Sequence, residues 1–112
     1  FQDNTAGKFG GAISAQKDAM ITTVGATSFE GNSAEEGGAV HATSGATVAL
    51  AGFQLFSNNT ASSNGGAIGL TFATSITITG RPQFIGNAAE GGSGGAIFCA
   101  STPQATFKNA NF

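Results

Sequence analysis

Tryptophan and tyrosine are absent from this sequence of 112 residues, and cysteine, methionine and histidine occur once each. Because Cys99 is alone, the chain cannot form a disulfide within itself. Only 9% of the residues are charged and the formal net charge is −2, so nucleic acid is not an expected partner. No apolar run approaches the roughly 20 residues of a membrane-spanning helix. These absences exclude a disulfide-bonded scaffold, a nucleic-acid-binding domain and a transmembrane helix within this stretch.

Phenylalanine and glycine, by contrast, are abundant and recur at fixed intervals. A Phe-x-x-Asn phrase, followed a few residues later by Gly-Gly-Ala and an aliphatic residue, occurs four times. The repeated positions are Phe1, Asn4, Gly10 and Gly11; Phe29, Asn32, Gly37 and Gly38; Phe56, Asn59, Gly65 and Gly66; and Phe84, Asn87, Gly94 and Gly95. The last residue, Phe112, falls where a fifth copy would begin. A fixed period of about 28 residues predicts a solenoid, in which each repeat forms one coil.

The period divides the chain into four coils, residues 1–28, 29–55, 56–83 and 84–111. Helix signals are nearly absent, and strand candidates recur in register. One set follows each double glycine, at 12–15, 39–42, 67–70 and 96–99; a second lies at 19–24, 46–50, 75–79 and 104–107; a third contains the repeated phenylalanine, at 27–30, 54–57 and 83–85. These strands predict an all-β right-handed parallel β-helix, the handedness following the rule for parallel crossovers. Adjacent coils should lie about 4.8 Å apart.

Alternation within the strands assigns the faces of the solenoid. Two columns should point inward: Ile13, Val40, Ile68 and Ile97, and Ala15, Ala42, Leu70 and Cys99. The column between them should point outward: Ser14, His41, Gly69 and Phe98. The repeated phenylalanines should stack in the interior. The repeated asparagines should form a ladder at a corner, because asparagine tolerates left-handed backbone and its amide can bond the next coil.

Few side chains suggest chemistry. Glu35 and Glu90 occupy one column two coils apart, about 10 Å by coil spacing, near the upper end of carboxylate separations in inverting glycosidases. We favour two solvated charges on a turn. We interpret His41 as an outward polar residue and Cys99 as a small buried thiol. The sequence therefore predicts no catalytic residue, no metal site, no cofactor and no enzyme activity.

Several further expectations concern loops and surface groups. The run 91–95 predicts an enlarged corner loop without calcium, because the aspartate of the glycine-rich calcium repeats is missing. Asn58 begins the only Asn-x-Thr sequon and is a possible glycosylation site. Lys8 and Glu36 each stand eighth in their coil, so we expect an ion pair between neighbouring coils.

The chain begins and ends on the repeated phenylalanine, without a recognisable cap. We therefore expect a fragment of a longer β-helical repeat domain. Further repeats of the same chain or other subunits would cover both ends, and the isolated stretch would associate or aggregate.

The paired phrases Gly-Gly-Ala-Ile/Val and Phe-x-x-Asn, in register through all four turns, resemble the chlamydial polymorphic outer-membrane proteins. The resemblance implies an extracellular or cell-surface location, at the outer membrane if the source is bacterial. It also implies a structural or adhesive β-helical passenger, as in autotransporters, with a surface protein or glycan of a host or neighbouring cell as partner. Two alternatives remain open: an enzyme acting on a polysaccharide, and a subunit of an extracellular filament.

Overall fold

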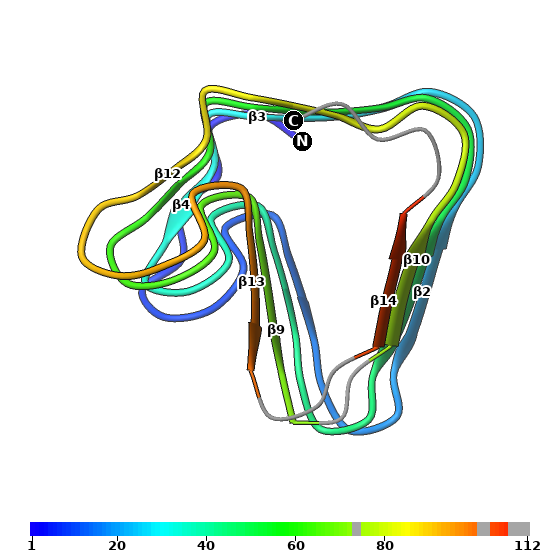
Figure 1. Ribbon diagram of the computed structural model, residues 1–112, viewed down its shortest axis with the longest axis horizontal. Coiled ribbons are helices and arrows are strands. Elements are labelled where there is room, and N and C mark those ends of the chain that lie inside the picture. The colour runs from blue at the N-terminus through cyan, green and yellow to red at the C-terminus, as the bar shows by residue number, and fades with distance from the viewer. Residues whose placement is uncertain (73–74, 101–103, 108–112) are drawn as a thin grey trace.

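The computed structural model describes residues 1–72, 75–100 and 104–107, the last segment by its backbone only, and Phe112 lies outside them. The described residues form strands and turns without a helix, wound as a right-handed parallel β-helix (Figure 1). Phe1, Phe29, Phe56 and Phe84 mark three complete turns, and a fourth continues beyond them. Within the described part, no helix has the length and apolarity needed to span a membrane.

Four parallel sheets form the walls. The first contains β1 (Ile13–Ala15), β5 (Val40–Ala42), β9 (Ile68–Thr71) and β13 (Ile97–Ala100); the second contains β2 (Met20–Thr23), β6 (Thr47–Leu50), β10 (Ser75–Ile78) and β14 (Gln104–Phe107). The third contains β3 (Thr27–Glu30), β7 (Gln54–Ser57) and β11 (Gln83–Ile85), and the fourth contains β4 (Ser33–Ala34), β8 (Thr60–Ala61) and β12 (Ala88–Ala89). The first three sheets lie within one residue of the predicted strands. The fourth was not predicted, because two-residue strands are too short to show alternation.

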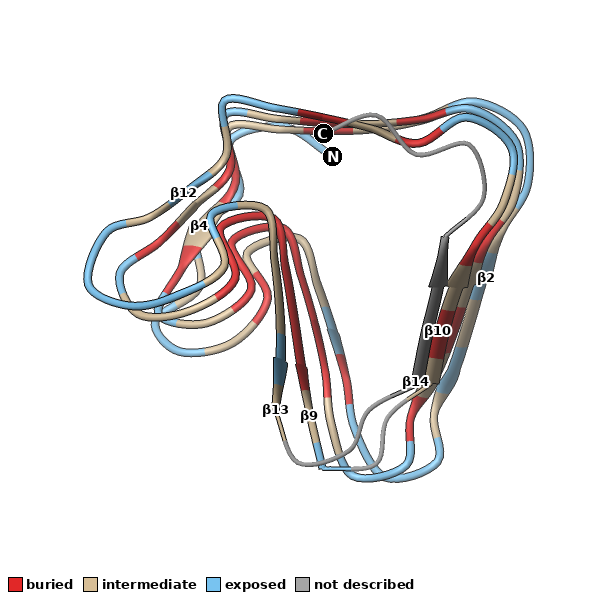
Figure 2. Ribbon diagram, viewed as in Figure 1, coloured by how far each residue is buried: buried red, intermediate tan, exposed pale blue. Residues whose placement is uncertain are grey.

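The register confirms the predicted columns. Ile13 pairs with Val40, Val40 with Ile68, and Ile68 with Ile97. Residues of the inner coils are buried on the strands and at the asparagine and double-glycine corners. The turns that join the first sheet to the second and the second to the third are mostly exposed (Figure 2). Cys99 departs from the prediction: it shares the inward column with Leu70, but it is exposed because no described strand covers β13 on its far side. Its partial burial still raises the pKa of the thiol.

The repeated phenylalanines form one continuous ring stack in the interior, as predicted. Successive ring centroids are 4.9, 4.7 and 4.9 Å apart, with interplanar angles of 4°, 5° and 7°. This spacing matches the distance between adjacent strands of a sheet. The stack therefore follows from the coil geometry, and Phe29 and Phe56 are fully buried within it.

The repeated asparagines form a hydrogen-bonded ladder beside the ring stack. Asn32 Nδ2 donates to Asn59 Oδ1 at 3.0 Å, and Asn59 Nδ2 donates to Asn87 Oδ1 at 2.9 Å. The same amide nitrogens also donate to carbonyls of the preceding coil, Asn32 to Phe1 and Asn59 to Phe29. Asn32 and Asn59 are fully buried, so the ladder satisfies polar groups that water cannot reach.

The left-handed backbone at this corner lies one residue before each ladder asparagine, not on it. The positive-φ residues are Asp3, Gly31, Asn58 and Gly86, with φ of 51°, 65°, 53° and 64°. Glycine, asparagine and aspartate are the residues that adopt this conformation at least cost. The third position of Phe-x-x-Asn therefore sets the bend, and the asparagine bonds the neighbouring coils.

The double glycine makes a second corner, and its two residues serve different needs. The first glycine has a positive φ in every coil, from 56° at Gly10 to 72° at Gly94. At the second glycine the backbones of adjacent coils approach closely: a Cβ on Gly38 would collide with the carbonyl oxygen of Gly66, and one on Gly66 with that of Gly95. Only glycine fits both positions without strain.

Candidate ligand-binding surface

Between the two corners of each coil, a loop projects from the solenoid. In the second, third and fourth coils the loops comprise residues 35–39, 62–67 and 90–96, and each of the last two is one residue longer than the loop before it. Figure 1 shows them fanning outward, with the loop of the fourth coil extending furthest. The predicted enlarged loop at 91–95 is thus confirmed. The loops are the part of the repeat in which length and sequence change from coil to coil.

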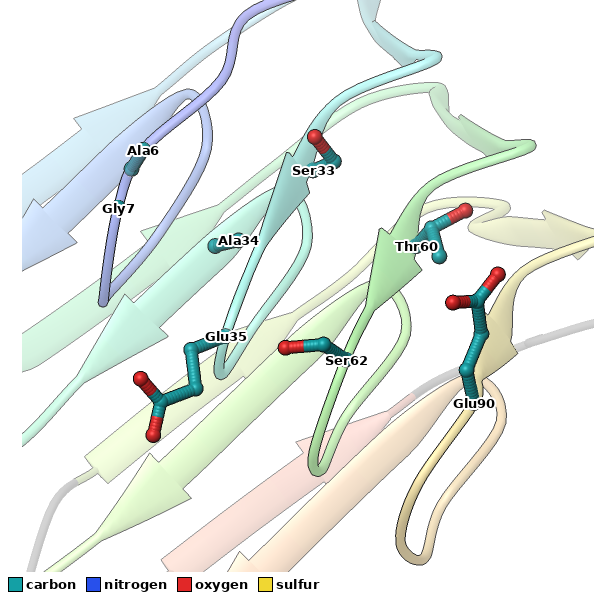
Figure 3. Close-up of a pocket in the computed structure, with 8 residues that line it drawn as sticks. All are labelled: Ala6, Gly7, Ser33, Ala34, Glu35, Thr60, Ser62 and Glu90. Atoms are coloured by element: carbon teal, nitrogen blue, oxygen red, sulfur yellow. The ribbon is translucent and has the colours of Figure 1, made fainter.

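One pocket of about 310 Å³ lies on the fourth sheet and its loops (Figure 3). Its polar lining comprises Ser33, Glu35, Thr60, Ser62 and Glu90. Glu35 and Glu90 therefore share one pocket, as their common column suggested. In Figure 3, however, the two carboxylates point in different directions, with Thr60 and Ser62 between them.

A second cavity, the loop groove, has a volume of about 350 Å³. Phe9 and Glu36 line it from the loop side, and His41 and Phe98 line it from the outer face of the first sheet. The groove therefore lies where the projecting loops of the first two coils meet the wall of the solenoid. It combines aromatic rings, a carboxylate and an imidazole in one concave site.

His41 lies at the base of the loop groove, and its burial corrects the sequence interpretation. The side chain alternates with the core residues Val40 and Ala42, so it leaves the sheet on the outer side as predicted. It is nevertheless only 1% exposed. The ring stacks on Phe9, with centroids 4.4 Å apart and an interplanar angle of 19°. The loop of the preceding coil therefore covers a position that alternation alone assigns to solvent.

The surroundings of His41 shift its pKa in opposite directions. Burial lowers the pKa of the imidazole, and this effect exceeds the opposing influence of the Glu36 carboxylate. His41 Nε2 lies 3.5 Å from Glu36 Oε2, a long separation for a hydrogen bond. Neither ring nitrogen has a hydrogen-bond partner. The groove therefore contains a buried imidazole whose charged form is disfavoured and whose ring nitrogens make no hydrogen bond within the protein.

The predicted ion pair between Lys8 and Glu36 does not form. In the described part of the chain Glu36 approaches His41 instead, a contact that is an ion pair only when the imidazole is protonated, while the Lys8 ammonium lies 5.5 Å from the centroid of the Phe9 ring. The register explains the error, because Phe9, not Lys8, bridges to Glu36. The first coil has one more residue than the second between the bridge at Thr5 and the bridge at Phe9.

Two further expectations from the sequence concern metal binding and glycosylation. No group of three or more His, Cys, Asp or Glu side chains that could hold a metal ion occurs within residues 1–72 and 75–100. Asn58 is exposed at the first corner, in left-handed backbone. Its accessibility is compatible with the glycosylation proposed from the sequon, which stays a prediction.

Comparison with known proteins identifies the repeat. The Chlamydia polymorphic membrane protein repeat family matches residues 1–16, 26–43 and 55–71. These segments contain the first three Phe-x-x-Asn and Gly-Gly-Ala phrases, and the structure adds a fourth copy in register at β11 to β13. No curated protein and no solved structure matches the chain. Three segments of the chain therefore match the Chlamydia polymorphic membrane protein repeat, and the chain is wound as a parallel β-solenoid.

Proposed function

We propose that this chain is a surface-displayed, structural and adhesive segment of a β-solenoid, of the kind found in autotransporter passengers. The observation that carries the proposal is the contrast between interior and loops. The ring stack and the asparagine ladder repeat in every coil, whereas the loops at 35–39, 62–67 and 90–96 differ in length and sequence. A constant scaffold with variable loops is the usual arrangement of a binding surface.

The family match supports a location at the outer membrane or cell surface, because the matched repeats are those of polymorphic membrane proteins. A stiff solenoid also suits display. Each coil contacts its neighbours through continuous parallel ladders, so loops on one side of the rod keep a fixed spacing. Adhesion would then occur through the loops and the outer faces of the sheets.

Surface display can be tested on intact cells that produce the parent protein. Antibodies against residues 1–112 should label unpermeabilised cells, and external protease should remove the labelling. Labelling only after permeabilisation would contradict the display proposal.

Adhesion requires a separate test. Beads coated with the purified chain should adhere to cultured epithelial cells more than albumin-coated beads do, and soluble chain should compete. A matched chain in which 90–96 is shortened to the length of 62–67 would show whether the longest loop contributes. Adherence equal to that of albumin beads would contradict the adhesive role.

An enzyme acting on a polysaccharide is the second candidate, and the pocket shared by Glu35 and Glu90 is the observation that favours it. Incubation with a polysaccharide panel should then release reducing ends. Glu90→Gln should abolish the release if these carboxylates act as acid and base. No reducing ends from any member of the panel would leave display as the function.

A further inference from the structure

The loop groove has features that mechanical display does not require. It is concave, it is lined by rings and polar groups, and it contains a buried histidine without hydrogen bonds. We propose that the loop groove binds a neutral sugar residue of a glycan. This inference rests on the proposed surface role and names the class of ligand that the surface would contact.

The aromatic side chains form the walls of the site. Phe98 pairs in register with Gly69, and Gly69 pairs with His41, so the outward column has a ring, a position without a side chain, and a second ring. Two coil steps separate the backbones that carry His41 and Phe98, about 10 Å at the usual spacing of strands. Phe9 stacks on the His41 ring. The electron-rich faces of such rings attract the C–H groups on the apolar face of a sugar.

Phe72 adds a further ring at the rim of the groove. It is 63% exposed and adopts a φ of 54°, which is unusual for a bulky side chain. The same conformation occurs at Lys17 and Ser44, the equivalent positions of the two preceding coils, so it belongs to the turn that follows the first sheet. A ligand in the groove would contact the exposed ring of Phe72.

The polar groups of the groove match hydroxyls. A neutral imidazole has one donor and one acceptor nitrogen, and both are without a partner on His41. Unpaired buried polar atoms destabilise the folded state, so such groups usually have a ligand or water to satisfy them. A sugar hydroxyl donates and accepts at once, and the Glu36 carboxylate beside His41 can accept from a neighbouring hydroxyl.

The charges of the groove disfavour an anion, and the cation site over its Phe9 ring is already filled. The Lys8 ammonium already occupies a cation site over Phe9, and it would repel a second cation there. An anion would face the carboxylates of Glu35 and Glu36, which line the same groove. A neutral ligand rich in hydroxyls meets neither repulsion.

The test is binding of the purified chain to an array of neutral and sialylated oligosaccharides, followed by titration with methyl glycosides of glucose, galactose, mannose, fucose and N-acetylglucosamine. We expect a neutral glycan to bind and its methyl glycoside to shift the NMR signals of the His41 imidazole. His41→Phe keeps a ring on Phe9 but removes both nitrogens, and Phe98→Ala removes one wall. Each should weaken binding about tenfold or more.

Matched controls lie outside the groove. Asp18→Asn changes a charge at an exposed left-handed turn, where asparagine is tolerated, and Phe53→Ala removes a half-exposed ring. Neither should alter glycan binding. Circular dichroism and melting would confirm that every variant folds, and a groove variant that fails to fold is replaced by Glu36→Gln.

Three results would overturn the inference: no glycan bound, binding unchanged in both groove variants, or binding of a lysine- and arginine-rich peptide in place of the sugars. The proposed surface role has its own readout. If His41→Phe beads adhere to cells as the unaltered chain does while no glycan binds, adhesion stands and the groove is not its contact. If adhesion itself fails, glycan binding by the purified chain still determines whether the groove is a sugar-binding site.

Discussion

Each coil contributes one phenylalanine ring and one asparagine amide to columns that run the length of the described solenoid. The ring stack is held by apolar burial and ring contact, whereas the ladder is held by hydrogen bonds between buried amides. Both columns depend on contacts to two neighbours. The loss of one side chain therefore removes contacts in three coils.

The cost of breaking the ring stack can be measured at Phe56, whose ring contacts Phe29 and Phe84 at 4.7 and 4.9 Å. We expect Phe56→Ala to lower the free energy of unfolding by about 3–5 kcal/mol, because it removes a fully buried aromatic ring. Thermal and urea denaturation would measure the loss. Ser57→Ala, the adjacent residue on β7, is the control, and equal shifts for the two variants would refute the prediction.

The ladder can be tested at Asn59. Asn59→Ala removes the donor to Phe29 and Asn87 and the acceptor for the backbone and side-chain amides of Asn32. We expect a loss of at least about 1–3 kcal/mol for each buried group left unpaired. Denaturation would be compared with Asn58→Gly, because glycine already occupies the equivalent position at Gly31 and Gly86. If Asn58→Gly were as unstable as Asn59→Ala, the loss of stability would come from the corner and not from the ladder.

His41 makes stability depend on pH. Burial lowers the pKa of His41 in the folded state, so between that value and the ordinary one near 6.5 the unfolded chain binds more protons. The stability that an uncharged His41 contributes to the folded state is therefore complete above about pH 6.5. It is lost as the pH falls through this window. The facing charges are Glu36, which partly opposes the shift, Glu35 in the same groove, and Lys8 over Phe9.

The measurement is the melting temperature at pH 8 and at pH 5.5. The unaltered chain should lose more than His41→Phe does on acidification, because the variant has no imidazole to charge. Equal losses in the two proteins would assign the pH dependence to other groups.

At the scale of elements, the corners decide where each strand begins. The third position of Phe-x-x-Asn and the first glycine of each doublet supply left-handed backbone. The second glycine allows adjacent coils to approach. The strands themselves are only two to four residues long, so the corners fix their register as much as strand pairing does.

Gly66→Ala tests this role of the corner. The new methyl group would collide with the carbonyl of Gly95 and the backbone of Ala88, and neither can move aside as a flexible side chain could. Overpacking of this kind typically costs about 1–3 kcal/mol or more. Gly7→Ala is the matched control, because its Cβ would enter open space and its φ is not positive. Equal melting temperatures for the two variants would contradict the close approach.

At the scale of the whole molecule, the solenoid is a series of coils in which each contacts only its neighbours. The inner strands β5 and β9 pair on both sides, whereas β1 and β13 pair with a described strand on one side. Local opening should therefore be easier in the outer coils.

Hydrogen exchange would show this difference. In the 112-residue chain, the amides of Val40 and Ile68 should exchange more slowly than those of strands β1 and β13. Uniform protection in all coils would mean that the solenoid opens as a single cooperative unit.

The sequence by itself determined the period, the sheets that carry the core and the two interior columns. These features repeat, and repetition shows which positions are equivalent without any knowledge of contacts. Phe29, Phe56 and Phe84 could be assigned to one stack because a coil of constant length brings them into register. The wall strands were recognisable for the same reason, since alternation recurred at the same place in each coil.

Only the tertiary structure decided the features that do not repeat. His41 is buried because a loop folds over its outward position, and Lys8 misses Glu36 because the first coil has one additional residue in its loop. The loop groove likewise joins Phe9 and Phe98, which stand three coils apart and share no motif. Loop lengths vary from coil to coil, so the contacts between loops and wall depend on where each loop lies in space, which the period does not specify.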